Sequence, residues 1–359
     1  MEAATADAVG ASRPLAQDVR VRAFAAGDEA DWDRFVDGIP DATFFHRAAW
    51  RDVIENVFHH PCPYLLAERG GAVCGVLPLA RIRSRLFGHS LVSLPFAVYG
   101  GPVAADPAAE QALIDAAVAL GESLGVEHLE LRNRVAKRAD WPRQDLYVTF
   151  RKALHADVDA NMKAIPRKQR AMVRKGIGNG LASEIDASTE RFFALYADNV
   201  HRHGTPPLAR RYFARLKAAF GDACEVLTVV DAEGRPVSGV MSFHFRDEVL
   251  PYYAGDTARA RDLAANDFKY WELMRRACER GVRTFDYGRS KRGTGSFDFK
   301  RNWGFEPTPL AYEYRLYRRD TVPQNNPLNP KYRAFIALWR RLPLPVANAL
   351  GPLIVRNLG

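Results

Sequence analysis

An internal duplication constrains the fold of this 359-residue chain more than any other feature of its sequence. Two stretches, 64–133 and 224–288, follow one order: two strands joined by a hairpin turn, a further strand, a helix and a closing strand. Within them, the segment VCGV at 73–76 aligns with VSGV at 237–240. Self-similarity of this kind indicates a repeated structural unit, so the sequence predicts two similar domains in tandem.

The turns and helix ends of both stretches support this prediction. RGG at 69–71 and DAEG at 231–234 have the composition of hairpin turns. The predicted helices, 109–125 and 266–281, both end at a glycine, which takes the left-handed backbone that closes many helices. We therefore expect an α/β (α+β) fold of two duplicated domains, each a mixed sheet flanked by helices.

The domain boundaries follow from where these patterns begin and stop. Residues 1–20 are expected to be a disordered lead, 21–150 the first domain, and 151–322 the second domain, which holds the active site. After residue 322 the sequence PQNNPLNP is rich in turn residues, so 323–359 is expected to be a linker and an amphipathic C-terminal tail.

Composition limits which cellular compartment and which kinds of partner the sequence predicts. The N-terminus lacks the basic and apolar regions of a signal peptide, and no run reaches the ~18 apolar residues of a membrane span. A cytoplasmic protein is therefore expected, at most peripheral at the inner face of the cytoplasmic membrane. The net charge of +9 favours an anionic partner, which includes nucleic acid, a phosphate-bearing substrate or an acidic membrane surface.

The cysteines and histidines do not predict a metal site. Cys62, Cys74, Cys224 and Cys278 lie far apart, without a CxxC pair or a histidine at zinc spacing, which indicates reduced thiols. HRHG at 201–204 has two histidines without a third ligand nearby. We interpret HRHGTPP as a loop that faces the substrate, in which Arg202 contacts an acidic acceptor.

The stretch DYGRSKRGTGSFDFKRNWGF, 286–305, places glycines and cations between a predicted strand and an aromatic segment. Glycines allow successive N–H groups to turn inward, and cations beside such a nest bind phosphate oxygens. The loop 288–295 is therefore a candidate anion site, with a flexible basic surface loop as the alternative. Its candidate substrate-binding residues are Arg289, Arg292, Gly293 and Gly295.

The duplicated unit followed by this stretch resembles the FemAB-related branch of the GNAT-like acyltransferases. The matching residues are Asp286-Tyr287-Gly288, Phe299-Lys300 and Trp303-Gly304-Phe305. The segments IPRKQRAMVRKGI, HRHGTPP, YYAGD and PQNNPLNPKYRAF resemble the subgroup associated with exosortase/PEP-CTERM systems of Gram-negative bacteria. The resemblance covers 20–359 and implies two GNAT-like domains, with the Phe-Lys pair at the reaction centre of the second.

The resemblance also implies a reaction. FemAB enzymes transfer an amino acid from aminoacyl-tRNA to the amine of a peptidoglycan-precursor peptide. The long helical arm of some members is absent here, and AGDTARARDLAAND at 254–267 lacks the Q/RxxGxG/A pattern of an acetyl-CoA site. The resemblance thus implies no tightly bound cofactor but a cosubstrate that donates the acyl group, either aminoacyl-tRNA or acyl-CoA.

Lys300 is the predicted catalytic residue, and Phe299 is assigned to the substrate through the resemblance alone. Attack of an amine on a carbonyl builds an oxyanion, which a positioned ammonium stabilises. Without the resemblance, a solvated lysine whose stem lies on Phe299 is the more probable interpretation.

The ends of two predicted strands supply further candidates. Asp286 and Tyr287 end the strand before the glycine-rich loop, and Tyr253 and Asp256 end its neighbour. Asp286 and Asp256 are both assigned catalytic roles, Asp256 in accepting or orienting the amine proton, and the two tyrosines are assigned to substrate binding. The alternatives are an ion pair of Asp286 with a nearby cation and a turn-capping role for Asp256.

Two cationic segments remain. Arg167, Arg170 and Arg174 recur on one helix face within a run, 160–183, that contains no acid. A stripe of this kind favours a diphosphate or an RNA backbone such as that of tRNA, although most charge runs are solvated faces. Residues 331–359 also lack acids, and aromatic and basic residues alternate there at helical spacing. This pattern predicts peripheral contact with an anionic inner-membrane surface or, alternatively, a helix packed on the second domain.

The leading hypothesis is an N-acyl- or aminoacyltransferase that acts on a phosphorylated or lipid-linked cell-envelope precursor in an exopolysaccharide/exosortase context. One alternative is an acyl-CoA-dependent N-acyltransferase that modifies the sugar of an exported polysaccharide. A non-catalytic module that binds RNA or an anionic ligand is the alternative outside the enzymes.

Overall fold

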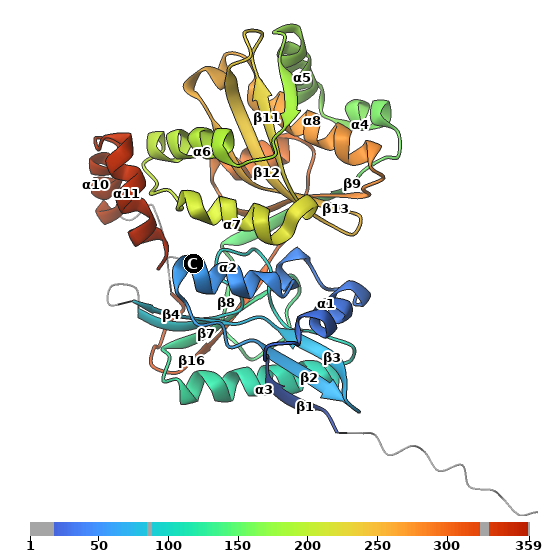
Figure 1. Cartoon of the computed structure of the whole chain (residues 1–359), viewed down its shortest axis with the longest axis vertical. Helices are drawn as coiled ribbons and strands as arrows, with labels where there is room; N and C mark the ends of the chain where they lie inside the picture. Colours follow the sequence, from blue (N-terminus) through green and yellow to red (C-terminus); the bar gives the residue numbers. More distant parts are fainter. Residues whose placement is uncertain (1–17, 85–87, 324–329, 358–359) are drawn as a thin grey trace, which may run out of the picture.

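The computed structural model describes residues 18–84, 88–323 and 330–357, with side chains described from 335 in the last segment. Two lobes lie one above the other, and the C-terminal helices lie beside the upper lobe (Figure 1). The lead expected at 1–20 and the linker expected after residue 322 fall mostly outside the described residues. None of the described helices is long and apolar enough to cross a membrane.

The lower lobe contains two small sheets. The first has the order β1-β2-β3-β6 and is antiparallel throughout, and the second has the order β4-β5-β7-β16-β8, with β5 and β7 parallel. Three helices and a 3-10 turn accompany them. The elements are β1 (Arg20–Ala23), α1 (Glu29–Gly38), η1 (Phe44–His46), α2 (Ala49–Phe58), β2 (Leu65–Arg69), β3 (Ala72–Leu77), β4 (Ala80–Ser84), β5 (Gly88–Val92), β6 (Val103–Ala104), α3 (Pro107–Ser123), β7 (His128–Asn133), β8 (Arg143–Gln144) and β16 (Ala311–Leu316).

The upper lobe is built on one mixed sheet of the order β10-β11-β12-β13-β14-β9-β15. Alternate residues of its strands face opposite cores: Val226 of β11 packs with α6, and Leu227 packs with α8. The elements are β9 (Tyr147–Ala153), α4 (Val158–Ala164), α5 (Arg167–Gly178), β10 (Ala182–Ile185), α6 (Glu190–Arg202), α7 (Arg210–Phe220), η2 (Gly221–Ala223), β11 (Cys224–Val230), β12 (Pro236–Phe245), β13 (Glu248–Asp256), η3 (Ala258–Arg261), α8 (Ala265–Glu279), β14 (Thr284–Lys291), α9 (Gly295–Asn302) and β15 (Pro307–Pro309).

The helix ends agree with the sequence in part. Gly125 and Gly281 follow the two predicted helices with left-handed backbone (φ 63° and 75°), which confirms their closing role. The first helix begins earlier than expected, at Pro107, because Asp106 caps it by accepting from the backbone N–H groups of Ala108 and Ala109.

The first repeat is more divided than its sequence indicates. The stretch 72–84 is two strands, β3 and β4, which belong to different sheets. Pro78 lies between them and has no backbone N–H to donate to a ladder, so the pairing changes there. The next stretch, 89–102, is a strand only as far as Val92.

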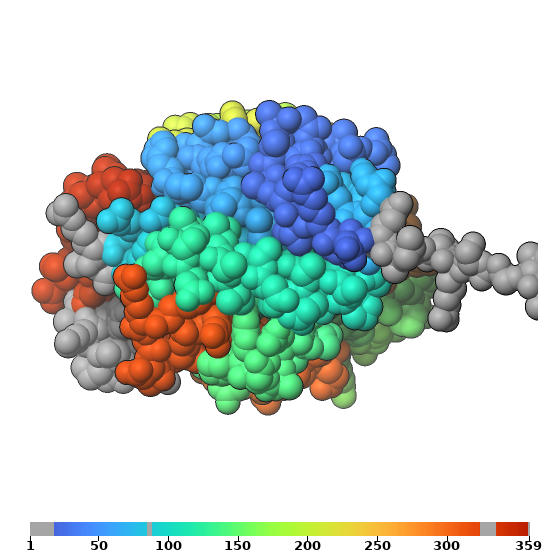
Figure 2. All heavy atoms as spheres, turned by 90° about the horizontal axis from the view of Figure 1, so that it is seen from below, coloured from blue at the N-terminus to red at the C-terminus, as the bar shows by residue number. Residues whose placement is uncertain are grey.

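Two strands cross the expected boundary between the domains. The boundary at residue 150 falls inside β9, which pairs with β14 in the upper sheet. Residues 311–316, expected in the second domain, form β16 and pair with β7 of the lower lobe. Seen from below in Figure 2, the orange segment that contains β16 lies among the teal and green residues of the lower lobe. The division of the sheets therefore does not follow the order of the sequence.

One hydrophobic core joins the lobes. It contains Trp50 and Phe44 of the lower lobe together with Tyr212 and Phe243 of the upper lobe. The rings of Phe44 and Phe243 stack with their centroids 4.4 Å apart, and α2 lies against α7 (Figure 1). Because this shared surface is apolar and buried, the lobes are fixed against each other.

Candidate functional site

The main cavity opens where two parallel strands of the upper sheet separate. β13 and β14 pair only at Glu248↔Thr284 and Val249↔Phe285, whereas β14 pairs with β9 on its other side from Thr284 to Lys291. A cavity of about 510 Å³ lies beyond the last pair of β13 with β14. Its strand walls are Pro251, Tyr252 and Tyr253 of β13 and Tyr287, Gly288 and Arg289 of β14.

The remaining walls come from both lobes. Phe96, Val98 and Arg132 belong to the lower lobe, and Lys300 belongs to α9 of the upper lobe. Five tyrosines and three cations line the cavity, and among its described lining residues there is no Asp or Glu. Such a wall attracts anions and offers flat aromatic surface. The other lining residues are Tyr196, Thr205, Pro206, Leu208, Tyr270, Ser296 and Val355.

Lys300 binds the backbone at the mouth of the strand separation. Its Nζ donates to the carbonyl oxygens of Tyr287 (2.6 Å), Gly288 (3.1 Å) and Arg289 (3.1 Å). Burial lowers the pKa of Lys300 to about 7, an effect that Asp286 opposes and Arg289 increases. The three carbonyl oxygens match the three N–H groups of an ammonium. Lys300 therefore brings an amine to the cavity wall, with its hydrogen bonds already used by β14 and its positive charge lost as the pH rises above 7.

Two arginines, Arg132 and Arg289, lie near the Tyr312 ring, with their guanidinium carbons each 5.7 Å from its centroid. Arg289 also lies 4.4 Å from the centroid of Tyr147. Burial alone would lower the pKa of Arg289, but the neighbouring tyrosines outweigh it and the pKa is raised. Arg132 is likewise buried, and its Nε donates to Glu130 at 2.7 Å. Both arginines remain charged, and no carboxylate pairs with Arg289 in the described structure.

The tyrosines of the cavity are hydrogen-bond donors. Burial raises the pKa values of Tyr287 and Tyr253 well above the usual value, so both hydroxyls keep their protons. The Tyr253 hydroxyl bonds that of Tyr212 at 2.9 Å. The buried Tyr287 hydroxyl has no hydrogen-bond partner among the described residues. An unpaired buried hydroxyl is costly, and a ligand in the cavity is one way to satisfy it.

Asp286 lies outside the cavity, one residue before Tyr287. It is almost fully buried, accepts from Arg151 at 2.9 Å and from the backbone N–H of Gly288 at 2.7 Å, and contacts the Tyr99 hydroxyl at 3.0 Å. Gly288 has left-handed backbone (φ 64°) at the point where the register with β9 shifts. Asp286 thus fixes a bulge that turns β14 away from β13, which is a positioning contact.

Asp256 and Arg202, from the YYAGD and HRHG segments, do not line the cavity either. The Asp256 carboxylate accepts from Lys269 Nζ at 2.8 Å, and Lys269 is fully buried. Arg202 donates to the backbone oxygen of Asp256 and to the Asp198 carboxylate at 2.9 Å. These groups therefore hold the end of β13 against α6. Of the predicted loop HRHGTPP, Thr205 and Pro206 do reach the cavity.

The loop expected at 288–295 is shorter than its sequence indicates. β14 continues to Lys291, so only 292–294 lie between this strand and α9. Arg292 is exposed and donates to the Asp145 carbonyl at 3.3 Å, and neither it nor Gly293 or Gly295 lines the cavity. The segment is therefore a tight turn that starts a helix, and an open nest of amides does not form.

Phe299 packs inside the upper lobe. Its ring contacts Tyr270, Tyr287 and Trp303, with centroids 5.5, 6.3 and 6.0 Å away. It supports the aromatic wall of the cavity from behind, and the cavity-lining residue of the Phe-Lys pair is Lys300.

The cationic stripe lies on α5, at the far end of the upper lobe from the lower lobe (Figure 1). Arg167 and Arg174 are exposed, Arg170 donates to the Lys163 carbonyl at 2.9 Å, and no ion pair involves them among the described residues. The stripe does not line the cavity. An anion bound there would contact the protein at a separate surface.

The sequence analysis missed the contribution of the lower lobe. Arg132 Nη1 donates to the carbonyl oxygens of Leu94 (3.2 Å) and Ala97 (3.0 Å), and the Tyr252 hydroxyl donates to that of Phe96 (2.7 Å). Leu94 and Phe96 both have positive φ, 59° and 60°, which is strained for these residues. The bonds hold a strained loop in the cavity wall. The duplication is a sequence signal for this contribution of the lower lobe, because the strained loop follows β5, the strand of the first repeat that corresponds to β13 of the second.

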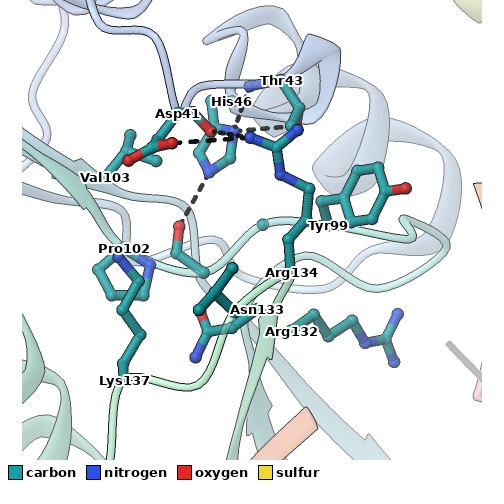
Figure 3. Close-up of a pocket in the computed structure, with 13 residues that line it drawn as sticks. Asp41, Thr43, His46, Tyr99, Pro102, Val103, Arg132, Asn133, Arg134 and Lys137 are labelled. Atoms are coloured by element: carbon teal, nitrogen blue, oxygen red, sulfur yellow. Dashed lines mark hydrogen bonds and ion pairs between the residues drawn. The ribbon is translucent and has the colours of Figure 1, made fainter. Parts of the chain in front are cut away.

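A second cavity, of about 80 Å³, lies in the lower lobe between η1 and the end of β7 (Figure 3). His46 spans it: Nδ1 accepts from the Thr43 N–H at 3.0 Å, so Nε2 carries the proton and donates to the Gly101 carbonyl at 2.9 Å. Burial lowers the pKa of His46 to about 4, so it stays neutral. In Figure 3 the Arg132 side chain points away from His46. This histidine is structural, because both of its ring nitrogens bond groups of the protein.

The histidines of HRHG bind carbonyl oxygens. His201 Nε2 lies 2.9 Å from the Leu342 oxygen, and His203 Nδ1 lies 2.7 Å from the Asn199 oxygen. In the described part of the chain, no three His, Cys, Asp or Glu side chains gather as a metal site would require.

Comparison with known proteins supports the fold. Residues 160–301 match the family model described as an acetyltransferase (GNAT) domain. No curated protein matches the chain by sequence. Among solved structures, FemX is similar with a TM-score of 0.63 and 14% identity, over 83% of this chain and 98% of FemX.

Two further solved structures are similar to this chain over most of its length. A tandem GNAT protein from the clavulanic acid biosynthesis pathway has a TM-score of 0.53 and 13% identity, over 85% of this chain and 100% of its own. The C-terminal domain of a protein named as a lysylphosphatidylglycerol synthetase, from Agrobacterium fabrum, has a TM-score of 0.55 and 13% identity, over 87% and 94%. The predicted fold of tandem GNAT-like units with mixed sheets is confirmed, and the GNAT match supports an acyltransferase.

Proposed function

We propose that this protein transfers an aminoacyl or acyl group to an amine of a phosphorylated cell-envelope precursor, in the cavity between β13 and β14. The observation that carries the proposal is the wall of this cavity, which combines three cations with tyrosine hydroxyls and has no carboxylate among its described lining residues. The GNAT match of the upper lobe supplies the reaction class.

The chemistry is attack of the amine nitrogen on the carbonyl carbon of the donor. A C–N bond forms, the carbonyl oxygen becomes an oxyanion, and the bond to the leaving oxygen or sulfur then breaks. The proton lost by the amine goes to the leaving group or to solvent. Lys300 acts by the charge of its ammonium on the oxyanion, since β14 already uses its N–H groups. Tyr287 is the candidate donor to a substrate oxygen because its hydroxyl has no other partner in the described part of the chain.

An aminoacyl donor fits the upper lobe better than an acyl-CoA. At the start of α8, where GNAT enzymes bind the CoA pyrophosphate, Asp267 lies in the first turn and accepts from Trp303 Nε1 at 3.0 Å. Arg259, a nearby cation, is paired with Asp231 at 3.3 Å. A carboxyl group in that position opposes a pyrophosphate. Aminoacyl-tRNA is therefore the proposed cosubstrate, and the stripe on α5 is the proposed contact with its backbone.

The acceptor is proposed from charge. Arg132 is buried and Arg289 is half-buried, and both line the cavity, where a cation attracts an anionic group more strongly than it does on an open surface. A phosphate or diphosphate next to the accepting amine would satisfy them. The link to peptidoglycan and to exosortase/PEP-CTERM systems rests on the motif resemblance alone.

The test offers labelled alanyl-tRNA and labelled acetyl-CoA separately, with a peptidoglycan-precursor peptide on a nucleoside diphosphate as acceptor. We expect transfer from the charged tRNA. Arg289→Gln should lower kcat/KM by about 10²-fold, the loss of one buried charged contact. Arg292→Gln is the matched control, since it lies outside the cavity three residues along the chain, and should transfer normally.

The outcomes separate the alternatives. Transfer from acetyl-CoA alone would favour the acyl-CoA enzyme. No transfer from either donor, together with retained binding of the acceptor, would favour a binding module. Equal loss in both arginine variants would remove the cavity as the site of the reaction.

A further inference from the structure

The C-terminal helices form a hairpin fixed to the upper lobe. α10 (Pro330–Trp339) and α11 (Leu344–Val355) lie beside α6 (Figure 1). The inner face is closely packed: Trp339 and Ala347 are buried, and a Cβ added at Gly351 would lie 2.4 Å from Pro207. The His60 side chain also contacts the Arg356 carbonyl at 2.6 Å. The hairpin is therefore part of the fold, as one sequence-based alternative for 331–359 predicted.

The outer face of the same hairpin is apolar and exposed. Leu338, Val346, Leu350 and Leu353 are 64%, 41%, 44% and 60% exposed. Across the described residues there are seven exposed large hydrophobic side chains, and four of them are these. Positions 346, 350 and 353 follow the spacing of one helix face, so they form a continuous stripe. A gathering of this kind indicates a surface that something apolar covers.

The charged side chains described in the hairpin itself are all positive. Arg340, Arg341 and Arg356 lie at the ends of the helices and are exposed. No Asp or Glu occurs in the sequence after Asp320. An apolar face bordered by cations and free of acids complements an anionic lipid surface, where leucines enter the acyl boundary and arginines meet the headgroups. Two copies of the chain packed face to face would instead bring like charges together without carboxylates to pair with them.

We propose that the outer face of the α10–α11 hairpin docks on an anionic lipid membrane. The docking places the main cavity at the membrane surface, because Val355 at the end of α11 is one of the cavity-lining residues. An acceptor that stays in the bilayer through a lipid tail would then present its diphosphate to Arg289 and Arg132. This consequence for the acceptor rests on the proposed function, whereas the docking itself does not.

Co-sedimentation of the full chain with vesicles tests the docking without any substrate. The wild type should sediment with vesicles that contain phosphatidylglycerol and remain in solution with phosphatidylcholine alone. The double variant Leu350→Gln/Leu353→Gln should bind about tenfold or more weakly, since it removes apolar area that enters the membrane. Arg341→Gln/Arg356→Gln should weaken binding by about 25-fold and flatten its dependence on salt.

The matched control is Ile177→Gln/Ile185→Gln, which removes two exposed apolar side chains, 51% and 42% exposed, from α5 and β10, outside the hairpin. It should bind vesicles as the wild type does, and all variants should keep the wild-type melting temperature. Failure of the wild type to bind anionic vesicles would overturn the proposal. So would a leucine variant that binds normally, or one that converts a dimer in solution to a monomer, because the face would then be an interface between two copies.

Discussion

Replacement of Lys300 by Met tests the electrostatic environment of the cavity most directly. The change keeps the apolar stem and removes the amine that donates to three carbonyl oxygens of β14. The folded protein holds the pKa of Lys300 at about 7, because burial disfavours the charge, whereas in an unfolded chain a lysine titrates near ~10.4. Above pH 7 the folded chain therefore holds this proton less tightly than the unfolded chain does.

Whether the unfolding free energy rises or falls with pH depends on which state, folded or unfolded, binds the proton. Between about pH 7 and 10 the unfolded chain holds the proton and the folded chain releases it, so raising the pH favours the folded state in this window. One pKa unit corresponds to about 1.4 kcal/mol, and between pH 7 and 9 the wild type should gain about 2 kcal/mol of unfolding free energy relative to Lys300→Met. The partial exposure of the side chain makes this an upper figure.

Urea unfolding followed by tryptophan fluorescence at pH 7 and pH 9 measures the difference between the two proteins. Lys175→Met, which removes an exposed amine from α5, is the control. Its unfolding free energy should differ from that of the wild type by the same amount at pH 7 and at pH 9. A constant difference between wild type and Lys300→Met would refute the pKa of about 7 and show that the three carbonyl oxygens hold the ammonium charged. Transfer activity should fall above pH 7 if the charge of Lys300 acts on the oxyanion; a rise would assign it as a base.

Two further predictions concern backbone packing and the cationic stripe. Gly255→Ala should destabilise the protein by about 3 kcal/mol in urea unfolding, because the new Cβ would lie 2.3 Å from the Tyr196 backbone nitrogen. Gly178→Ala has open space and should stabilise by up to about 1 kcal/mol; equal effects would contradict the close approach of α6 to β13. Changing Arg167, Arg170 and Arg174 together to Gln should leave the melting temperature unchanged while tRNA binding in a filter assay weakens and depends less on salt. Unfolding of this triple variant would identify the arginines as structural partners.

Sequence reasoning placed several cavity residues correctly in space. Tyr253 and Tyr287 were chosen from strand ends, Arg289 from the glycine-rich loop and Lys300 from a motif, and all four line one cavity. Strand ends are legible because alternation and turn residues are local properties of the chain. The direction in which a polar side chain at such an end points is decided by its neighbours. Asp286 and Asp256 illustrate this, since they bind Arg151, 135 residues away, and Lys269, 13 residues away on α8, instead of facing the cavity.

The prediction of an open loop over 288–295 was wrong for a related reason. Composition alone suggested an open loop over 288–295, but Gly288 serves a bulge that keeps β14 paired with β9, and the strand runs on to Lys291. A bulge needs left-handed backbone as a nest does, so the two uses of glycine look alike in a sequence. The pairing partner, more than a hundred residues away, distinguishes them.

The sequence is enough to predict the repeated unit, the helix ends at Gly125 and Gly281, and the polar character of the site, because these depend on residues near one another in the chain. The assignment of β9 to the upper sheet and of β16 to a lower sheet emerges only from the folded structure. The same is true of the cavity of the upper lobe, which Arg132 and a strained loop of the lower lobe complete. The folded structure also decided which face of the C-terminal hairpin is buried. These outcomes depend on which distant surfaces exclude water together, and that selection is made only when the whole chain packs.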